Sequence, residues 1–178
     1  MSIEVRDAVP AEYDAVGKIV AAAFAADGQL DAPDSVSYRD VLHDVAARAA
    51  AAEIIVALDD GVVVGGVTYV PRGGPMADIA GDGEAEIRML GVAPDAQGRG
   101  AGSALMRECL ARAARDGGTA AGSGRAAAST RTRRVVLSTN TIAHGSHRLY
   151  ERLGFVRDPA RDWTPVPGVD LLCYVLDL

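Results

Sequence analysis

Hydrophobic residues recur along the chain with two spacings, and each spacing predicts one kind of regular element. Apolar side chains three or four residues apart are typical of helices that bury one face. This spacing predicts four helices, over residues 10–25, 36–51, 100–116 and 146–153. Pro10 suits the first turn of the first helix, and Gly154 favours the end of the last one.

Runs of β-branched and other apolar residues, bounded by turn residues, predict strands. Such runs occupy residues 2–9, 53–58, 62–70, 84–92, 135–139, 155–157 and 171–176. Only Asp59-Asp60-Gly61 separates the second run from the third, and this sequence favours a tight hairpin turn. A helix lies between the strands at 84–92 and 135–139, which indicates that these two strands are parallel.

The predicted elements follow the order βααβββαβαββ, which is typical of an α+β (mixed α/β) fold with one central mixed sheet. A chain of 178 residues suits one compact domain, so we expect residues 1–178 to form a single domain. Residues 117–134 consist only of Gly, Ala, Ser, Thr and Arg. Such a segment can bury little apolar surface, and we expect a flexible insert there.

The composition is that of a globular protein, because 49% of the residues are hydrophobic and 24% are charged. No apolar run reaches the roughly 18 residues that a membrane span requires, and the first residues do not resemble a signal peptide. We therefore expect a cytoplasmic protein without membrane contact. The net charge of −6 disfavours nucleic acid as a partner and favours cationic substrates such as amines.

The most informative segment lies where the strand at 84–92 leads into the helix at 100–116. Three glycines alternate there: Gly98, Gly100 and Gly102. The first N–H groups of a helix have no partner within it, and glycines let a ligand approach the backbone closely, so this turn favours a phosphate. The segment fits neither a P-loop nor a Rossmann motif. From the spacing alone, a tight turn without a ligand is an equal alternative.

Two sequence blocks resemble those of the GNAT N-acetyltransferase superfamily. Gln97-Gly98-Arg99-Gly100-Ala101-Gly102 is similar to the Q/R-x-x-G-x-G/A signature, at its usual strand-to-helix junction. Residues 146–155, Ser-His-Arg-Leu-Tyr-Glu-Arg-Leu-Gly-Phe, resemble the second block, A-x-x-L-Y-x-x-x-G-F. The order of elements is also similar, and the insert at 117–134 is the departure from it.

The resemblance implies an acyltransferase that uses acetyl-coenzyme A (acetyl-CoA) as co-substrate and no metal. The pyrophosphate would lie on the backbone N–H groups of Gln97, Gly98, Arg99, Gly100, Ala101, Gly102 and Ser103. The pantetheine arm would pair with Leu90, Gly91 and Val92, beside a gap where the next strand diverges. Gly91 marks either a β-bulge at this gap or a small residue beneath a neighbour. Asn140 and His147 are further candidates for cofactor contact, with capping and surface roles as the alternatives.

Acetyl transfer to an amine needs an acid for the departing thiolate and a base for the amine. The resemblance implies that Tyr150 is the acid, because the tyrosine of the family points at the sulfur of coenzyme A. Glu86 is the candidate base, directly or through water, and Glu84 is the reserve. Strand alternation places both glutamates and Arg88 on one face, opposite Ile87 and Met89. An ion pair of Glu86 on a solvated strand face is an equal alternative.

Three segments, 24–44, 71–83 and 158–168, are expected to form the acceptor pocket. They carry several aspartates and Trp163, the only tryptophan, so their walls would be acidic and partly aromatic, which suits an amine cation; acidic segments that simply face solvent are the alternative. The oxyanion would be stabilised by the backbone N–H of Val92 or Leu90.

We therefore predict an acetyl-CoA-dependent N-acetyltransferase whose acceptor is a primary amine of a small molecule. The alternatives are a protein N-terminal or lysine acetyltransferase and a non-catalytic acyl-CoA-binding sensor. Many members of the family pair as dimers, so a homodimer stays open.

Overall fold

The computed structural model describes residues 3–116 and 131–178, so most of the predicted insert at 117–134 lies outside the described residues. The strands are β1 (Ile3–Asp7), β2 (Glu53–Asp59), β3 (Val62–Val70), β4 (Glu84–Val92), β5 (Arg134–Asn140), β6 (Val156–Arg157), β7 (Trp163–Val166) and β8 (Val169–Asp177). The helices are α1 (Tyr13–Ala26), α2 (Val36–His43), α3 (Val45–Ala49), α4 (Ala101–Arg115) and α5 (His144–Arg152).

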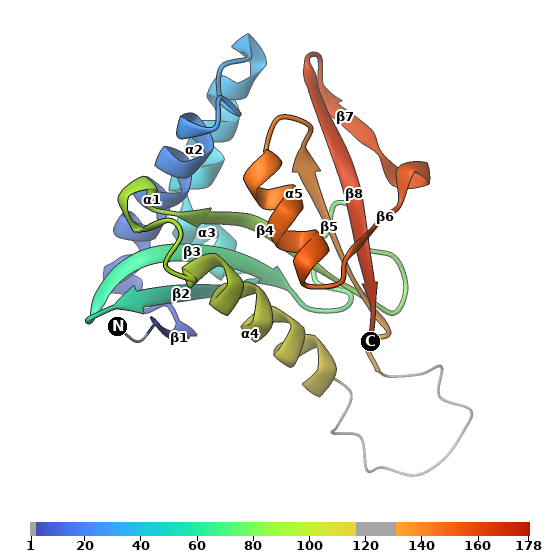
Figure 1. The fold of residues 1–178 in the computed structure, drawn as a ribbon, viewed down its shortest axis with the longest axis horizontal. Helices are drawn as coiled ribbons and strands as arrows, with labels where there is room; N and C mark the ends of the chain where they lie inside the picture. Colours follow the sequence, from blue (N-terminus) through green and yellow to red (C-terminus); the bar gives the residue numbers. More distant parts are fainter. Residues whose placement is uncertain (1–2, 117–130) are drawn as a thin grey trace.

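All of these strands belong to one sheet, in the order β1-β2-β3-β4-β5-β8-β6, with β7 paired to β8 (Figure 1). The β4–β5 pair is parallel, and the other pairs are antiparallel. This arrangement confirms the predicted α+β class with a central mixed sheet. The hairpin prediction is also confirmed, since Asp60 (φ 49°) and Gly61 (φ 79°) form the turn between β2 and β3.

Two predictions of secondary structure were wrong. The helix expected over residues 36–51 is two helices, because Asp44 leaves the helical conformation (φ −80°, ψ 67°) and its side chain caps α3 at Ala47 N, at 3.0 Å. The segment 158–168, expected to be a loop, contains the extra strand β7. Its Pro165 obscured the strand pattern, although proline is tolerated in strands at a sheet edge.

Helices cover both faces of the sheet. Helix α1 packs on one face through Val16 and Val20, in a cluster that includes Met89 of β4. On the other face, Leu105 and Met106 of α4 pack with Ile87 of β4 and with residues of α5. Figure 1 shows α4 and α5 in front of the sheet and α1 to α3 behind it. The sheet is thus buried from both sides around β4.

A β-bulge interrupts the middle of β4. Its partner register jumps from Thr68↔Arg88 to Gly66↔Gly91, and Met89 adopts a left-handed backbone with φ 53°. Two residues apart on a regular strand, Ile87 and Met89 would share a face of the sheet. Because of the bulge they lie on opposite faces: Met89 packs with α1, and Ile87 faces α4. The predicted alternation, with Ile87 and Met89 on one face, was wrong at this point, and the bulge lies at Met89 instead of Gly91.

Gly91 is small because helix α1 crosses directly over it. A Cβ atom at this position would lie 2.8 Å from Val20 Cα and 3.3 Å from Ala23 Cβ. We expect Gly91→Ala to destabilise the fold by about 1–3 kcal/mol, because backbone cannot rotate aside as a flexible side chain can. Chemical denaturation of both proteins measures this difference. Gly145→Ala is the matched control, since nothing lies within 4 Å of the added methyl, and an unchanged Gly91→Ala protein would contradict the packing described.

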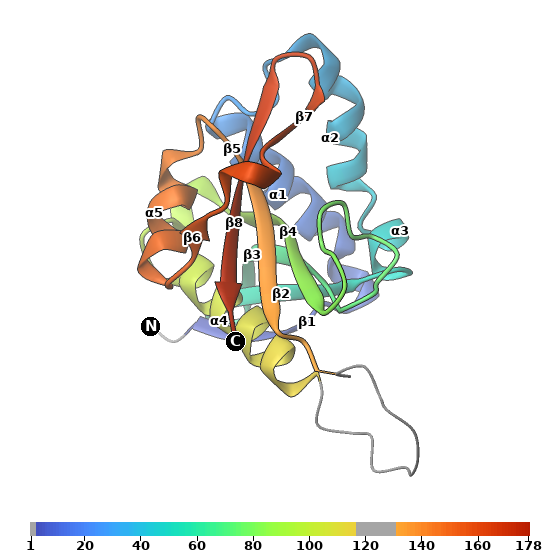
Figure 2. The ribbon, with the colours of Figure 1, turned by 90° about the vertical axis from the view of Figure 1, so that its right-hand side faces the viewer.

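The parallel strands β4 and β5 stay together over only half of β4. Pairing runs from Glu84↔Arg134 to Ile87↔Leu137 and then stops, while β5 continues on β8 as far as Asn140. Figures 1 and 2 show the two strands diverging beyond this point. The divergence leaves the edge of β4 after Ile87 without a neighbouring strand on that side.

Candidate active site

The glycine-rich turn after β4 leaves its backbone accessible. Gly98 (φ 79°) and Gly100 (φ 93°) adopt left-handed conformations, and no atom lies within 4 Å of a Cβ built on either residue. The first helical hydrogen bond of α4 runs from Ala104 N to Gly100 O, so the preceding N–H groups point out of the helix end. This turn can bind an anionic group through its backbone.

Side chains around this turn are turned away from the glycines. Arg99 pairs with Asp59 at 3.2 Å and donates to Asp95 O, and Gln97 lies 3.5 Å from Val92 O. Ala101 is buried in the α4 core. The side chains of Arg99 and Gln97 thus have partners within the protein, while the backbone of the two glycines is accessible.

A cavity of about 420 Å³ opens at the gap between β4 and β5. Leu90 lines it from the unpaired edge of β4, whereas Gly91 and Val92 do not. The opposite walls come from α2 and the β7–β8 hairpin, through Tyr38 and Trp163 among others. The three segments expected to surround the acceptor, 24–44, 71–83 and 158–168, all contribute to this cavity.

Tyr150 lies in the last turn of α5 and lines the cavity, with only 6% of its surface exposed. Its ring packs against Phe155 and Tyr174, with ring centroids 6.1 and 5.9 Å away. Burial raises the pKa of Tyr150 to about 12, although hydrogen bonding with Ser146 and Thr139 acts in the opposite direction. The phenol therefore keeps its proton at neutral pH.

The contacts of Glu86 argue against its predicted role as the base. The residue is 1% exposed and is not among the residues that line the cavity. Its Oε2 accepts three backbone hydrogen bonds, from Asp78 N (2.9 Å), Ile79 N (2.9 Å) and Ala80 N (3.0 Å). Burial raises the pKa of Glu86 in spite of these bonds. The side chain therefore anchors the 71–83 loop and has no free path to a substrate.

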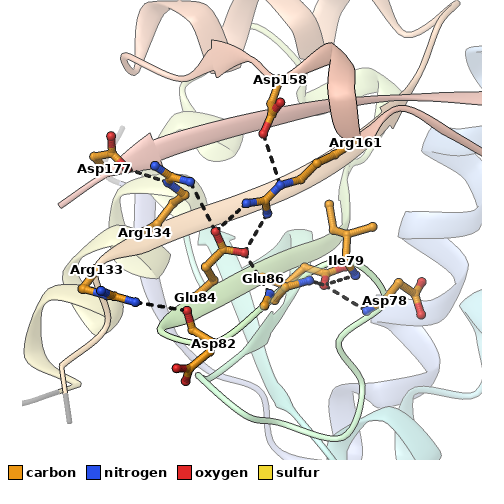
Figure 3. Close-up of polar contacts among 12 residues, drawn as sticks. Asp78, Ile79, Asp82, Glu84, Glu86, Arg133, Arg134, Asp158, Arg161 and Asp177 are labelled. Carbon is orange, nitrogen blue, oxygen red and sulfur yellow. Dashed lines mark hydrogen bonds and ion pairs between the residues drawn. The ribbon is translucent and has the colours of Figure 1, made fainter. Parts of the chain in front are cut away.

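Glu84, the reserve candidate, is engaged in the same way. Its Oε2 accepts a bond from Gly81 N at 2.8 Å, and Arg161 donates to both carboxylate oxygens at 2.7 and 2.9 Å. Arg134 lies 3.5 Å from Oε1. Figure 3 shows how these contacts join the 71–83 loop to β5 and to the segment before β7. The two glutamates thus hold four consecutive amides of one loop.

The cavity walls are less acidic than the sequence suggested. Of the aspartates on the three segments, Asp78 lines the cavity, and its carboxylate pairs with the Arg88 guanidinium. Asp162 instead pairs with Arg157 at 2.7 Å, outside the cavity lining. Sequence reasoning counted Asp78 among several wall aspartates but did not single it out, because the loop pattern does not indicate which of its two acids, Asp78 or Asp82, faces inward.

Asn140 and His147 lie next to each other at the end of β5. Asn140 lines the cavity, and its Oδ1 accepts a bond from Ile142 N at 3.2 Å, as expected of a residue that caps the turn. His147 Nε2 lies 2.9 Å from Asn140 O, and its ring packs on Tyr174 at 6.0 Å. His147 is not among the cavity-lining residues.

Comparison with known families identifies this architecture. A family profile described as Acetyltransferase (GNAT) domain matches residues 50–157, which is more than half of the chain. The protein belongs to the GNAT acetyltransferase family. Its membership confirms the predicted resemblance and makes it an N-acetyltransferase, with acetyl-CoA as co-substrate. A search of curated proteins found no match.

Solved structures share the fold of this GNAT protein at low sequence identity. PaiA N-acetyltransferase from Thermoplasma acidophilum, solved with coenzyme A, is 13% identical over 100% of both chains, with a TM-score of 0.71. YncA from Salmonella typhimurium, solved with acetyl-CoA, is 22% identical over 100% of this chain and 95% of that one, with a TM-score of 0.67. Ribosomal-protein-alanine N-acetyltransferase from Brucella melitensis is 19% identical over 98% and 99%, with a TM-score of 0.63.

The described residues also set limits on other kinds of site. Within 3–116 and 131–178, no group of three or more His, Cys, Asp or Glu residues is arranged to hold a metal ion. Across the same ranges, no helix combines the length and apolar character that a membrane crossing requires.

Proposed function

We propose that this GNAT protein acetylates a primary amine of a small molecule by direct attack on acetyl-CoA. The observation that supports the proposal is the cavity at the β4–β5 gap, which both Tyr150 and Leu90 line. Its volume of about 420 Å³ falls in the range of small-molecule sites, roughly 300–1,000 Å³. The unpaired edge of β4 would bind the pantetheine arm of the cofactor. The glycine-rich start of α4 would bind its pyrophosphate.

In this proposal, the cofactor is held mainly by backbone. The N–H groups of residues 97–103 bind the pyrophosphate, and the β4 edge at Leu90 to Val92 pairs with the pantetheine arm. Of the two candidate oxyanion donors, the proposal assigns Leu90 N–H, since Leu90 lines the cavity and Val92 does not.

The chemical step balances with one acid supplied by the protein. The amine nitrogen forms a bond to the acetyl carbon, the C–S bond breaks, and Tyr150 gives its proton to the sulfur. The substrate ammonium loses two protons, of which one restores Tyr150 and one passes to solvent. Because burial makes the phenolate costly, Tyr150 passes its proton to the sulfur while the C–S bond is breaking and regains a proton from the amine, so that no phenolate accumulates.

Binding of acetyl-CoA is the first test. We expect acetyl-CoA at a hundred times its Kd to stabilise the protein by about 2.7 kcal/mol, because the ligand binds only the folded state. For a chain of this size this free energy corresponds to a rise of about 5–11 °C in Tm. Differential scanning fluorimetry measures the shift in Tm. A calorimetric titration that shows no heat of binding at millimolar acetyl-CoA would refute the proposal.

Turnover is the second part of the same test. A panel of primary amines, assayed by release of the free thiol of coenzyme A, should contain acceptors that raise thiol release above the rate with water alone. Peptides with free N-termini or lysines belong in the panel, because they distinguish the protein-modifying alternative. Faster turnover of peptides than of every small amine would replace the proposed acceptor class.

A further inference from the structure

The charges inside the cavity consist of one compensated pair. Among the described residues that line it, Asp78 is the one carboxylate and Arg88 the one cation, and they form an ion pair with each other. Arg88 also donates to Met76 O, and its side chain is only 16% exposed. The Asp78 side chain is 39% exposed, so its carboxylate is the accessible member of the pair. The cavity therefore offers one negative group to a ligand.

The carboxylate of Asp78 is held in place through its backbone. The amides of Asp78, Ile79, Ala80 and Gly81 are bound in succession by Glu86 and Glu84, and Arg161 fixes Glu84 in turn (Figure 3). Ile79 and Ala80 also pack against a small core formed by β5 and β8. A loop anchored on both its polar and apolar sides presents Asp78 in one position, which reduces the entropy lost when a ligand binds.

Asp78 lines the same cavity as the proposed position of the reacting atoms. Its partner Arg88 is on β4, two residues before Leu90, and all three residues line the cavity at the β4–β5 gap. An ammonium group beside Asp78 therefore shares this cavity with the position proposed for the thioester, and the amine can move onto the acetyl carbon after losing a proton.

The remaining walls are mostly apolar. Phe24 and Tyr38 form an aromatic pair with centroids 6.1 Å apart, and Trp163, Pro165 and Val166 face them from the β7–β8 hairpin. Hydroxyl and amide groups are present, but among the described lining residues Asp78 is the only carboxylate, so a second ammonium group on the ligand has no carboxylate partner there. Burying an unpaired charge is costly, so polyamines fit this cavity poorly.

We infer that the acceptor is a primary amine with a single positive charge on an apolar, aromatic-sized body, and that Asp78 receives its ammonium group. This inference rests on the proposed function of the same site. Glu86 and Glu84 act as positioning residues for the Asp78 loop, without contact with the substrate. Aromatic side chains along the cavity would pack against the body of the amine.

The experiment measures equilibrium binding to the protein saturated with coenzyme A, which prevents turnover. The probes are 2-phenylethylamine and tryptamine, compared with their uncharged counterparts 2-phenylethanol and tryptophol and with the polyamine spermidine. Isothermal titration calorimetry should show at least tenfold tighter binding of each amine than of its alcohol, because a charge-assisted contact with Asp78 exists only for the amine. Spermidine should bind more weakly than either aromatic amine.

Two matched variants locate the effect. Asp78→Asn keeps the size of the side chain and the backbone bonds, and it should bring the amine and the alcohol to within about threefold of each other. Asp82→Asn changes an acid on the same loop outside the cavity and should keep the full preference. Equal Tm values and equal coenzyme A affinity for the three proteins establish that the fold and cofactor site are intact.

Several results would overturn the inference. These are equal binding of amine and alcohol by the wild-type protein, a preference that survives in Asp78→Asn, tighter binding of spermidine, and absence of binding by every aromatic probe. If acetyl-CoA still binds and other amines are acetylated, the inference fails while the proposed function stands. If acetyl-CoA itself does not bind, the proposed function fails.

Discussion

Tyr150→Phe should lower kcat by about 10²–10⁴-fold, because the variant removes the only hydroxyl proposed to protonate the departing thiolate. The affinity for acetyl-CoA should change little, since the phenyl ring keeps its packing against Phe155 and Tyr174. Steady-state assays of thiol release, together with calorimetric titration of coenzyme A, separate the two effects.

The pH profile adds a second readout for the same residue. Burial raises the pKa of Tyr150 to about 12, so the acid form persists across the whole range in which the protein can be assayed. We therefore expect no loss of kcat from Tyr150 ionisation as the pH rises to 10. Tyr174→Phe is the control, because Tyr174 packs on Tyr150 but is not among the cavity-lining residues. Equal kcat for Tyr150→Phe and the wild-type protein would remove the proposed acid.

Glu86→Ala should destabilise the protein by about 2–4 kcal/mol. The substitution leaves three amides of the 71–83 loop without their acceptor, and each buried amide that loses its partner costs about 1–3 kcal/mol, less whatever water recovers. For a protein of this size the loss corresponds to a fall of about 4–16 °C in Tm. Chemical and thermal denaturation measure it.

Glu86→Gln separates anchoring from base catalysis. The glutamine oxygen can still accept the amide bonds, so stability should stay within about 1 kcal/mol of the wild-type value. Burial raises the pKa of Glu86, so the folded wild-type protein binds the carboxyl proton more tightly than the unfolded chain does. The stabilisation that this carboxyl group gives the wild-type protein is thus lost as the pH rises above 4.5. The stability of Glu86→Gln relative to the wild-type protein should therefore increase with pH.

Activity then decides the role of Glu86. If the residue only positions the loop, Glu86→Gln should keep kcat within a few fold of the wild-type value and leave the pH–rate profile unchanged in shape. A loss of two orders of magnitude in kcat, without a change in Tm, would restore Glu86 as the base.

The parts of the fold that the sequence predicted are those set by short-range chemistry. The turn at Asp60-Gly61 needs two left-handed residues in succession, which these residue types favour in any context. Gly98 and Gly100 likewise specify the turn that opens α4. The boundaries of β4 were predicted correctly because Gly83 precedes the strand pattern and Pro94 lies two residues after it.

The roles of the acidic residues could not be predicted in this way. Glu84, Glu86 and Asp78 all read as polar residues near a strand start, and any of them could have faced the cavity. Packing of the 71–83 loop against β5 and β8 decides the matter, because it buries Glu86 under three amides and leaves Asp78 at the cavity wall. Contacts between segments far apart in sequence have no local signature.

The sequence by itself indicated the family, most of the elements in their order and the glycine-rich turn that opens α4, since these depend on residue types within a few positions of each other. Tertiary structure alone decided the bulge at Met89, the end of the β4–β5 pairing at Ile87 and the identity of the exposed carboxylate. The physical reason is that each of the latter depends on which distant backbone or side chain occupies the neighbouring space. Residue pattern sets what a segment can form, and packing sets what its side chains can reach.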